Sequence, residues 1–585
     1  MDIQIKRRFD EKELSDMKTV LAKAKKIATD VTIGETLFMK KHGVKSEAEY
    51  KRRMMAEGKI MKHSVIGWNE WSVTKQGFKN VYHGLKERGS YINRFGVALD
   101  WVMGVPGQYR KDFQVGGGLI FQTQEEWDAL GQVVPVQPHL GDHMIGSLNA
   151  VENTTRGLKA GVTAIGNLAQ YFTYEYPGLE MEGYRTEEYM TAIAIMGEFR
   201  EQGAVIHCNL DDGYGAQFHD VANLLGWAKL ERYIAEDLLG GRVAHTYGNL
   251  FSDSMLRVVF NRALCKIDQY NTPGSFVNGN TIDYGLDIQQ NYGALCAYSL
   301  ADIICQMKYP AGYAIAPVPL TEAIRVPSAE EMIEAHRTVD MMIEKAPYYE
   351  KFINWEKIES EAEILVTGAN VFFEKVINAL DDLGVDITHA GQVSAVLKAT
   401  GPKQLEMAFG AGLADKDAMR GRIPIRPTSI VKTITAIQDE AMANIGLGDE
   451  KPLKGINIVA GSTDVHEFGI EVVRNVVTKA GANVFDLGTT VSVSEIADTL
   501  VETGSNIVLM STYNGIAFSF GHDLLESLKK TGLQDIHIIM GGRLNEPIDG
   551  SDVPVDVSHL LQEMGINTDN NIDTIVDTIV SYKGV

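Results

Sequence analysis

The pattern of apolar and polar positions changes along the chain. Residues 1–90 have the pattern of charged helices. From 91 to 345, short apolar runs alternate with longer stretches of helical period. The runs are QVVPVQP (132–138), AGVTAIGN (160–167), GAVIHCNL (203–210), GRVAHTYGN (241–249) and AGYAIAPVP (311–319). Strands that alternate with helices over about 250 residues predict a parallel α/β architecture, and a (β/α)8 barrel matches that length.

The pattern beyond residue 345 predicts a second, smaller α/β domain. Residues 346–450 are mostly of helical character and form a linker that contains GRIPIRPTS (421–429), whose prolines mark a connection. Residues 451–585 then hold four short apolar runs at regular spacing, INIVA (456–460), NVFDL (483–487), NIVLM (506–510) and IHIIM (536–540). Helical stretches lie between these runs, which predicts a doubly wound sheet of the flavodoxin type.

Composition and charge exclude several classes of partner. A chain of 585 residues is too long for one ordinary core, and its net charge of −22 argues against nucleic acid. The charge is uneven, since residues 1–90 carry twenty Lys+Arg against twelve Asp+Glu, and we expect this basic arm to pack on the acidic remainder. No membrane-length apolar segment, secretory signal or paired-cysteine motif is evident. We therefore expect a cytoplasmic homo-oligomer without a membrane partner.

Polar residues end several of the apolar runs in the predicted barrel. They are His139, Asn167, Asn209 and Asn249. A (β/α)8 barrel places its chemistry at the carboxyl ends of its strands. We therefore expect these four side chains at the active face of the barrel.

Three polar or glycine-rich segments follow strands in the last domain. Their members are Asp464, His466 and Gly469 after the first strand, Ser511, Thr512 and Tyr513 after the third, and Gly541 and Gly542 after the fourth. The carboxyl edge of an open α/β sheet is where ligands bind, so one ligand can contact all three segments. A histidine in such a loop can bind a metal, and an aspartate two residues away can orient it. The alternative is an ordinary polar surface loop.

These segments together resemble the cobalamin-binding domain of B12 enzymes. That family has D-x-H-x-x-G, S-x-L and G-G at similar spacings, and Tyr513 stands here in place of the usual leucine. The resemblance implies that His466 is the lower axial ligand of cobalt and that Asp464 orients it. It also implies that Gly469 lies in the cofactor loop and that the nucleotide tail enters a crevice lined by Ser511, Gly541 and Gly542.

The cobalamin-binding domain by itself is compatible with two classes of B12 enzyme. Corrinoid methyltransferases and methyl carriers have a similar D-V-H-D-I-G loop after a helical module. Mutases instead place adenosylcobalamin against a (β/α)8 barrel. HTYGNLFSDSMLRVV (245–259), PLTEAIRVPSAEE (319–331) and VPVQPHLGDH (134–143) are similar to segments of the glutamate mutase large subunit, which favours an adenosylcobalamin-dependent carbon-skeleton mutase.

The resemblance to the mutases assigns several barrel residues. Glu322 falls where the family binds the adenosyl ribose, and Asn249 lies in the matching G-N-L segment, whereas Val318 replaces a lysine of the family. His139 stands where the family has an arginine for a substrate carboxylate, and Gly166 stands where it has a glutamate that faces an amine. The substrate therefore need not be an amino acid.

A fused chain of this kind is similar to the 2-methyleneglutarate mutases, which interconvert 2-methyleneglutarate and 3-methylitaconate by a radical rearrangement. A dicarboxylic acid in a dry barrel needs cationic partners, and Arg94 and Arg110 are candidates, with Tyr171 and Tyr174 as further substrate-site candidates. For each arginine, a surface or interface role is the alternative. A fused glutamate mutase-like isomerase, a methyltransferase and a pyridoxal-phosphate-dependent aminomutase also remain possible functions.

Overall fold

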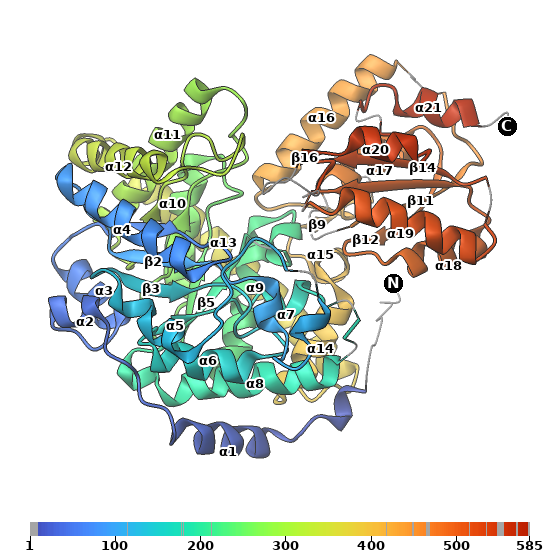
Figure 1. Cartoon of the computed structure of the whole chain (residues 1–585). Helices are drawn as coiled ribbons and strands as arrows, with labels where there is room; N and C mark the ends of the chain where they lie inside the picture. The colour runs from blue at the N-terminus through green and yellow to red at the C-terminus, as the bar shows by residue number, and fades with distance from the viewer. Residues whose placement is uncertain are drawn as a thin grey trace. The chain divides into compact units, whose positions relative to one another are not determined.

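The computed structural model divides the chain into two compact units, Met1–Ser429 and Ile430–Val585 (Figure 1). The structure describes residues 10–582 except for 114, 177, 180, 212, 417, 447–449, 464–467, 514, 534, 547–554 and 569–570. The boundary between the units lies inside the segment 346–450, which the sequence pattern presents as a linker. Helices α13 (Trp355–Asp382), α14 (Ala390–Thr400) and α15 (Pro402–Phe409) of that segment belong to the first unit, and α16 (Ser429–Ile445) falls almost wholly within the second.

The first unit is built on a curled parallel sheet of six strands. Their order in space follows the sequence, and they are β1 (His63–Val65), β2 (Arg94–Val97), β3 (Gln137–Leu140), β4 (Ala164–Ile165), β5 (Val205–Asn209) and β6 (Val243–Thr246). Strands β7 (Phe276–Asn278) and β8 (Ala314–Ala316) form a separate parallel pair. Single parallel bridges join Tyr247 to Val277 and Lys62 to Ile315. The predicted parallel α/β class is confirmed, and the complete (β/α)8 barrel stays a prediction.

Alternate residues of these strands pack in two different environments. Leu140, Ile165, Ile206 and Val243 belong to the large core that also includes residues of helices α8 and α9. The neighbouring residues Ala164, Val205 and Ala244 form a separate small cluster with Ala48 of helix α3. Successive residues of a strand point to opposite faces, so one face of this sheet meets the helical layer and the other meets α3.

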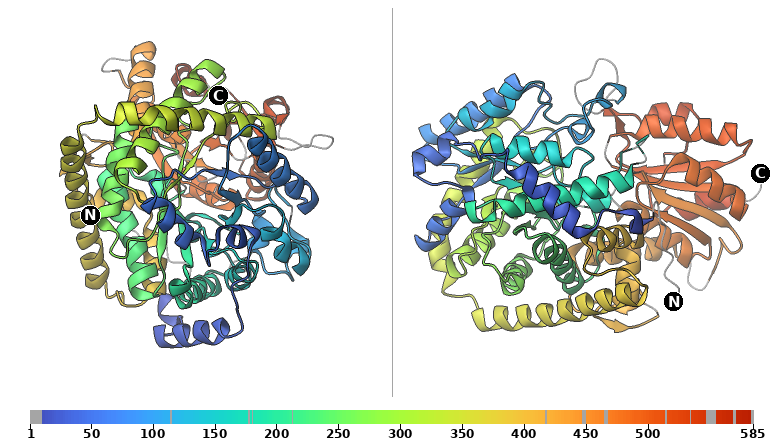
Figure 2. Two further views of the ribbon diagram at one scale, coloured as in Figure 1. Left: turned by 90° about the vertical axis from the view of Figure 1, so that its left-hand side faces the viewer. Right: turned by 90° about the horizontal axis from the view of Figure 1, so that it is seen from below.

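Fifteen α-helices of the first unit accompany these strands within the described residues. Figure 2 shows helices of this unit on the outside of its strands. They are α1 (Met17–Ala28), α2 (Leu37–His42), α3 (Glu47–Ala56), α4 (Trp71–Glu87), α5 (Gln124–Ala129), α6 (Ala150–Lys159), α7 (Gln170–Thr173), α8 (Glu182–Glu198), α9 (Val221–Arg232), α10 (Ser254–Ile267), α11 (Ile288–Lys308), α12 (Ala329–Glu350), α13 (Trp355–Asp382), α14 (Ala390–Thr400) and α15 (Pro402–Phe409).

Some basic residues of the arm pair with acidic residues elsewhere in the first unit, in line with the prediction, and others pair within the arm. Lys62 lies 2.6 Å from Asp340, and Arg88 lies 2.6 Å from Glu330. The arm also contains β1, which pairs with β2 and so forms part of the sheet. Among the described residues, no helix combines the length and apolar character that a membrane crossing requires.

The second unit has the strand order expected of a doubly wound sheet. All four strands run parallel in the order β12 (Asn483–Gly488), β11 (Asn457–Ser462), β13 (Ile507–Thr512) and β14 (His537–Gly542). The four predicted strands are therefore confirmed to within one or two residues at each end. The accompanying helices are α17 (Phe468–Lys479), α18 (Val493–Thr503), α19 (Ala517–Lys530), α20 (Ser558–Glu563) and α21 (Ile575–Ser581).

Both faces of this sheet are covered, which explains the continuous apolar runs in the middle of β11, β13 and β14. Ile458 and Ala460 of β11 pack in one core with residues of α17 and α21, whereas Val459 packs in another with residues of α18 and α19. A strand that is buried on both faces has a continuous apolar run. Figure 1 shows helices on both sides of this sheet.

Candidate functional site

The carboxyl edge of the second sheet brings together residues from three strands. Ser511 of β13 lies in register with Ser462 of β11 on one side and with Gly541 of β14 on the other. The backbone N–H of Thr463, which follows β11, donates to the carbonyl of Ser511 at 2.9 Å. The predicted meeting of these segments at one edge is therefore observed for the described residues.

Two glycines at this edge have close neighbours where a side chain would begin. A Cβ at Gly469 would lie 2.8 Å from Oγ of Ser511, and a Cβ at Gly542 would clash with the carbonyl oxygen of Thr512. Gly542 also has φ +90°, a conformation that disfavours any residue with a Cβ. Glycine at both positions keeps the backbone within close reach of a ligand at the edge.

The same edge offers polar and aromatic groups. Oγ1 of Thr512 is buried and has no hydrogen-bond partner among the described residues. A buried hydroxyl without a partner is costly unless a ligand or water satisfies it. Tyr513 is half exposed, and the guanidinium of Arg543 lies 5.0 Å from the centre of its ring. Small residues, an unpaired hydroxyl and an exposed ring fit the tail of a large polar cofactor. Asp464 and His466, the predicted cobalt-binding pair, lie outside the described residues.

In the first unit, polar residues at the ends of β4, β5 and β6 are joined by hydrogen bonds. Oδ1 of Asn167 accepts from the backbone N–H of Asn209 at 3.1 Å. The backbone N–H of Asn249 donates to Asp211 at 2.5 Å, and the hydroxyl of Thr281 donates to Oδ1 of Asn249. Asn167 and Asn249 therefore lie in hydrogen-bonded loops after β4 and β6, and Asn209 is the last residue of β5.

His139, the fourth, lies inside its strand and not after it. β3 begins at Gln137, later than the apolar run 132–138 indicates, because a short 3₁₀ turn and Pro135 precede it. His139 faces Gly96 in register on β2, on the same face as Ala164 of β4. Its ring therefore belongs to the interior of the sheet.

Three histidines form a layer on this interior face, and we call His63, His139 and His207 the histidine layer. The ring centres of His139 and His207 lie 4.6 Å apart, and those of His63 and His139 lie 6.1 Å apart. The ring of Phe276 stacks on His63 at 4.1 Å and on His207 at 5.4 Å. Burial, aided by the charge of Arg94, lowers the pKa of all three imidazoles well below the usual value, so they are neutral at pH 7.

Arg94 lies in a charged group next to the histidine layer. Its guanidinium and the ammonium of Lys51 each lie 3.0 Å from Glu47 of α3, and all three side chains are buried. Arg94 also donates to Oγ of Ser275 at 3.0 Å. This arrangement places two cations against one carboxylate, so the group carries one excess positive charge.

The other predicted barrel residues lie elsewhere in the first unit. Arg110 donates to the backbone carbonyls of Val105 and Met103 at 2.8 and 3.1 Å. Glu322 is exposed in the turn after β8, and the ring of Tyr174 lies 4.7 Å from that of His143. The structure therefore does not bring Arg110, Glu322 and Arg94 into one described contact.

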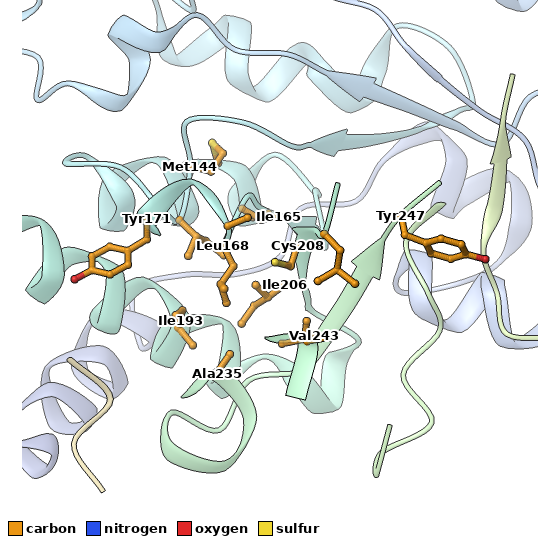
Figure 3. Close-up of a cluster of buried hydrophobic side chains, with 14 of the residues drawn as sticks. Met144, Ile165, Leu168, Tyr171, Ile193, Ile206, Cys208, Ala235, Val243 and Tyr247 are labelled. Carbon is orange, nitrogen blue, oxygen red and sulfur yellow. The ribbon is translucent and has the colours of Figure 1, made fainter. Parts of the chain in front are cut away.

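Tyr171 lies in the helical layer. It is fully buried on α7, and its hydroxyl lies 2.7 Å from Oγ1 of Thr186. Its ring stacks on Tyr189 at 4.1 Å. Figure 3 shows Tyr171 among apolar side chains that include Leu168 and Ile193. These contacts are those of a core residue.

His63 and His207 are candidate site residues that the sequence pattern did not single out. His207 lies in the run GAVIHCNL, where one polar residue interrupts a buried strand, and that interruption was the available signal. His63 lies in β1, inside the segment that the pattern presents as helical. A polar side chain on the interior face of a short strand weakens the apolar run that identifies the strand.

A second polar cluster lies on the helical side of β5 and β6. Ligand atoms of Cys208, Glu231 and His245 all lie within 4.8 Å of one another. Glu231 already accepts from Nε1 of Trp227 at 2.8 Å and lies 3.0 Å from Nε2 of His245, and burial raises its pKa to about 8. Figure 3 shows Cys208 among Ile165, Ile206 and Val243. We therefore describe this cluster as a hydrogen-bonded network within the core.

Comparison with known proteins relates one part of the chain to a B12 enzyme subunit. Over 94 residues, or 16% of this chain, it is 33% identical to the glutamate mutase sigma subunit of Carboxydothermus hydrogenoformans, and the match covers 69% of that subunit. The chain belongs to the glutamate mutase sigma subunit family. No family model matches the chain.

One solved structure is also similar to this chain, a member of the sigma subunit family. It is a cobalamin-binding protein from Desulfitobacterium hafniense, with 22% identity over 37% of this chain and 93% of that protein. The TM-score is 0.20, which is too low to indicate a common fold. The family membership rests on the sigma subunit match alone.

Proposed function

We propose that the chain is an adenosylcobalamin-dependent mutase that rearranges the carbon skeleton of a dicarboxylic acid, 2-methyleneglutarate to 3-methylitaconate. The observation that carries the proposal is the match to the sigma subunit of glutamate mutase. The edge formed by Ser511, Gly541 and Gly542 supports it, since a doubly wound sheet binds its ligand at that edge.

The residues that would hold the cofactor are Gly469, Ser511, Tyr513, Gly541 and Gly542, together with His466 as the cobalt ligand and Asp464 as its orienting partner. When bound, adenosylcobalamin supplies an organic radical that abstracts hydrogen from the substrate. The two glycines would let the backbone contact the tail, and the unpaired hydroxyl of Thr512 would find a partner there.

The first unit would bind the acid and exclude water. Its interior face is lined by the histidine layer, with the excess positive charge of Arg94, Lys51 and Glu47 beside it. A buried positive charge attracts a carboxylate strongly, because the dielectric screening of water is absent. The strand-end residues Asn167, Asn209 and Asn249 would orient the polar ends of the substrate.

Gly166 supports a substrate without an amine. A Cβ at Gly166 would lie 2.6 Å from Cδ2 of His207, so no carboxylate side chain fits there unless His207 moves. A substrate ammonium needs such an acceptor, because an unpaired charge away from water is costly. The nearby carboxylate of Asp211 already accepts the backbone N–H of Asn249.

The helical segment 355–409 does not favour the methyl-carrier alternative. Ile358, Leu365 and Phe372 of α13 and Leu405 of α15 belong to the main core of the first unit. A separate helical module before a methyl-carrying domain would have a core of its own.

Activity assays with two cofactors test the proposal. We expect turnover of 2-methyleneglutarate with adenosylcobalamin and none with methylcobalamin, followed as 3-methylitaconate by NMR. L-glutamate should react at least about tenfold more slowly, since burying its ammonium group without an acceptor costs more than about 1.4 kcal/mol. Turnover only with methylcobalamin and a methyl acceptor would establish a methyltransferase, and comparable conversion of glutamate would establish a fused glutamate mutase.

Electron paramagnetic resonance of the bound, reduced cobalt tests the cobalt ligand. We expect coupling to a protein nitrogen in the wild type and its loss in His466→Gly, with Asp464→Asn weakening cofactor affinity about 10- to 100-fold. His522→Gly is the matched control, because His522 is exposed on α19. Protein nitrogen coupling that persists in His466→Gly would show that another residue is the ligand.

A further inference from the structure

The ring nitrogens of the histidine layer have unequal sets of partners. Nδ1 of His139 lies 2.8 Å from the carbonyl oxygen of Ala164, whereas its Nε2 is buried without a partner. Within the part of the chain that the structure describes, neither nitrogen of His63 has a hydrogen-bond partner. Nδ1 of His207 lies 2.9 Å from Oγ of Ser275. Three ring nitrogens on one interior face therefore lack hydrogen-bond partners among the described residues, and each costs about 1–3 kcal/mol if left unpaired. This cost indicates that a ligand or water binds there.

Hydrogen bonding determines which nitrogens carry protons. A carbonyl oxygen can only accept, so Nδ1 of His139 carries the proton and Nε2 of the neutral ring presents a lone pair. Oγ of Ser275 accepts from Arg94 and can donate its own hydroxyl proton to Nδ1 of His207, and in that arrangement Nε2 of His207 carries the proton. His139 and His207 therefore present an acceptor and a donor side by side.

The unpaired nitrogens lie near two glycines, Gly96 of β2 and Gly141 after β3. Nε2 of His63 lies 2.9 Å from the position of a Cβ on Gly96, and Nε2 of His139 lies 3.5 Å from that of a Cβ on Gly141. Gly141 directly follows β3, at its carboxyl end. Active groups of parallel α/β folds lie toward that end of the strands.

Charge at the layer favours an anion. The charged groups beside it are Glu47 and Lys51 of α3 and Arg94 of β2, which sum to one positive charge. The buried His336 of α12 also acts on His63, and burial lowers the pKa of His336 well below its usual value. A dicarboxylate brings two negative charges. A lone pair on Nε2 of His139 repels a carboxylate oxygen, but a proton on that nitrogen converts the contact into a charged hydrogen bond and balances the second negative charge.

We propose that a carboxylate of the ligand binds against the histidine layer together with one proton, which is held on Nε2 of His139. Nδ1–H of the same ring remains bonded to Ala164, and Nε2–H of His207 donates to the same carboxylate. This inference rests on the proposed dicarboxylate substrate, but it concerns binding alone and needs no cobalamin.

Calorimetry of glutarate binding to the full chain, in buffers of different ionisation enthalpy, tests the coupling. We expect uptake of about one proton per glutarate near pH 7, and a Kd that rises about tenfold per pH unit from about pH 6.5 to about pH 7.5. That range lies below the pKa of Lys51, which burial lowers to about 8. Glutaramide, a neutral molecule of similar length, should bind more weakly and without proton uptake.

His139→Gln assigns the proton. The glutamine keeps a hydrogen-bonding side chain but does not titrate, so we expect proton uptake and the pH dependence of Kd to disappear. His389→Gln is the matched control, since His389 at the start of α14 is also buried and lies outside the histidine layer. That variant should retain uptake of one proton.

Several results would overturn the inference. They are no glutarate binding by the wild-type chain, binding without proton uptake, and unchanged uptake in His139→Gln. If His139→Gln does not fold, ¹⁵N spectra of the histidine-labelled wild type decide, because a ring nitrogen must change from unprotonated to protonated when glutarate is added. Proton-linked binding without B12-dependent turnover would support the inference and refute the proposed function.

Discussion

Individual residues at the edge of the second sheet are small because backbone and ligand need the space. Gly542 combines a positive φ with a carbonyl neighbour that a Cβ would strike, so two separate constraints select glycine there. Gly469 is constrained by Oγ of Ser511 only, which is a side-chain atom that can rotate. The two positions should therefore differ in their tolerance of alanine.

Gly542→Ala should weaken cobalamin binding about tenfold or more. Its Cβ would displace the carbonyl of Thr512 and so distort the edge, and the strained backbone should cost about 1–3 kcal/mol of stability. Spectrophotometric cobalamin titration and chemical denaturation measure the two effects. Gly532→Ala is the control, since Gly532 has φ +74° but open space around a Cβ, and it should lose stability without losing affinity. Equal affinities for both variants would contradict this assignment of the edge.

Helix α3 is held to the sheet of the first unit by buried charge as well as by packing. Glu47 binds both Arg94 of β2 and Lys51 of its own helix. The ammonium of Lys51 also donates to the backbone carbonyl of Ser275, just before β7, at 2.7 Å. Glu47 and Lys51 together therefore link α3 to β2 and to the segment before β7, which are far apart in the sequence.

Glu47→Ala should destabilise the first unit by about 3–5 kcal/mol, because it leaves two buried cations without their counter-ion. Equilibrium unfolding in denaturant measures the loss. Glu152→Ala is the control, since Glu152 pairs with Arg156 at 2.7 Å on the exposed face of α6 and should cost no more than about 0.5 kcal/mol. A loss below 1 kcal/mol for Glu47→Ala would show that the buried ion pairs do not hold α3 in place.

At the scale of the whole molecule, the two units have separate cores. Among the described residues, the large core of the first unit extends to Ile425, and the two cores of the second begin at Ala441 and at Val459. Units with their own cores can fold alone. The buried charges and histidines described above belong to the first unit only.

Residues 430–585 should fold by themselves and bind cobalamin. A ligand at about 100 times its Kd stabilises the folded state by about 2.7 kcal/mol, so cobalamin should raise the thermal midpoint of this fragment and of the matching transition in the full chain. Circular dichroism melting with and without cobalamin measures both shifts. A fragment that is unfolded at room temperature would contradict the independence of the second unit.

Acid should destabilise the first unit before the second. Burial lowers the pKa of His63, His139, His207, His245 and His336 well below the ordinary value of about 6.5. The unfolded chain therefore binds more protons than the folded one below about pH 6.5, and stability falls as pH falls through that value.

Each such histidine contributes a slope of up to about 1.4 kcal/mol per pH unit below about pH 6.5. Denaturant unfolding of the full chain at a series of pH values between about 5 and 8 measures that slope, and the fragment 430–585 is the control. A free energy of unfolding that stays constant from about pH 6.5 to about pH 5 would show that these histidines are already charged in the folded state.

The sequence by itself was sufficient for the second unit. Strands β11 to β14 lie where the apolar runs predict them, because a sheet covered on both faces leaves a continuous apolar run in the sequence. The meeting of Ser511, Gly541 and Gly542 at one edge was predictable for the same reason, since parallel strands end on one side.

Only the tertiary structure decided what the interior of the first unit contains. β1 and β2 carry His63 and Arg94 on their interior faces, and such polar residues hide short strands from a search for apolar runs. Arg94, a predicted substrate clamp, has its carboxylate partner on α3, at Glu47. The histidine layer joins residues from three strands that are far apart in the chain. Local periodicity reports which positions are buried, whereas the contacts among buried polar groups depend on how the strands are arranged in space.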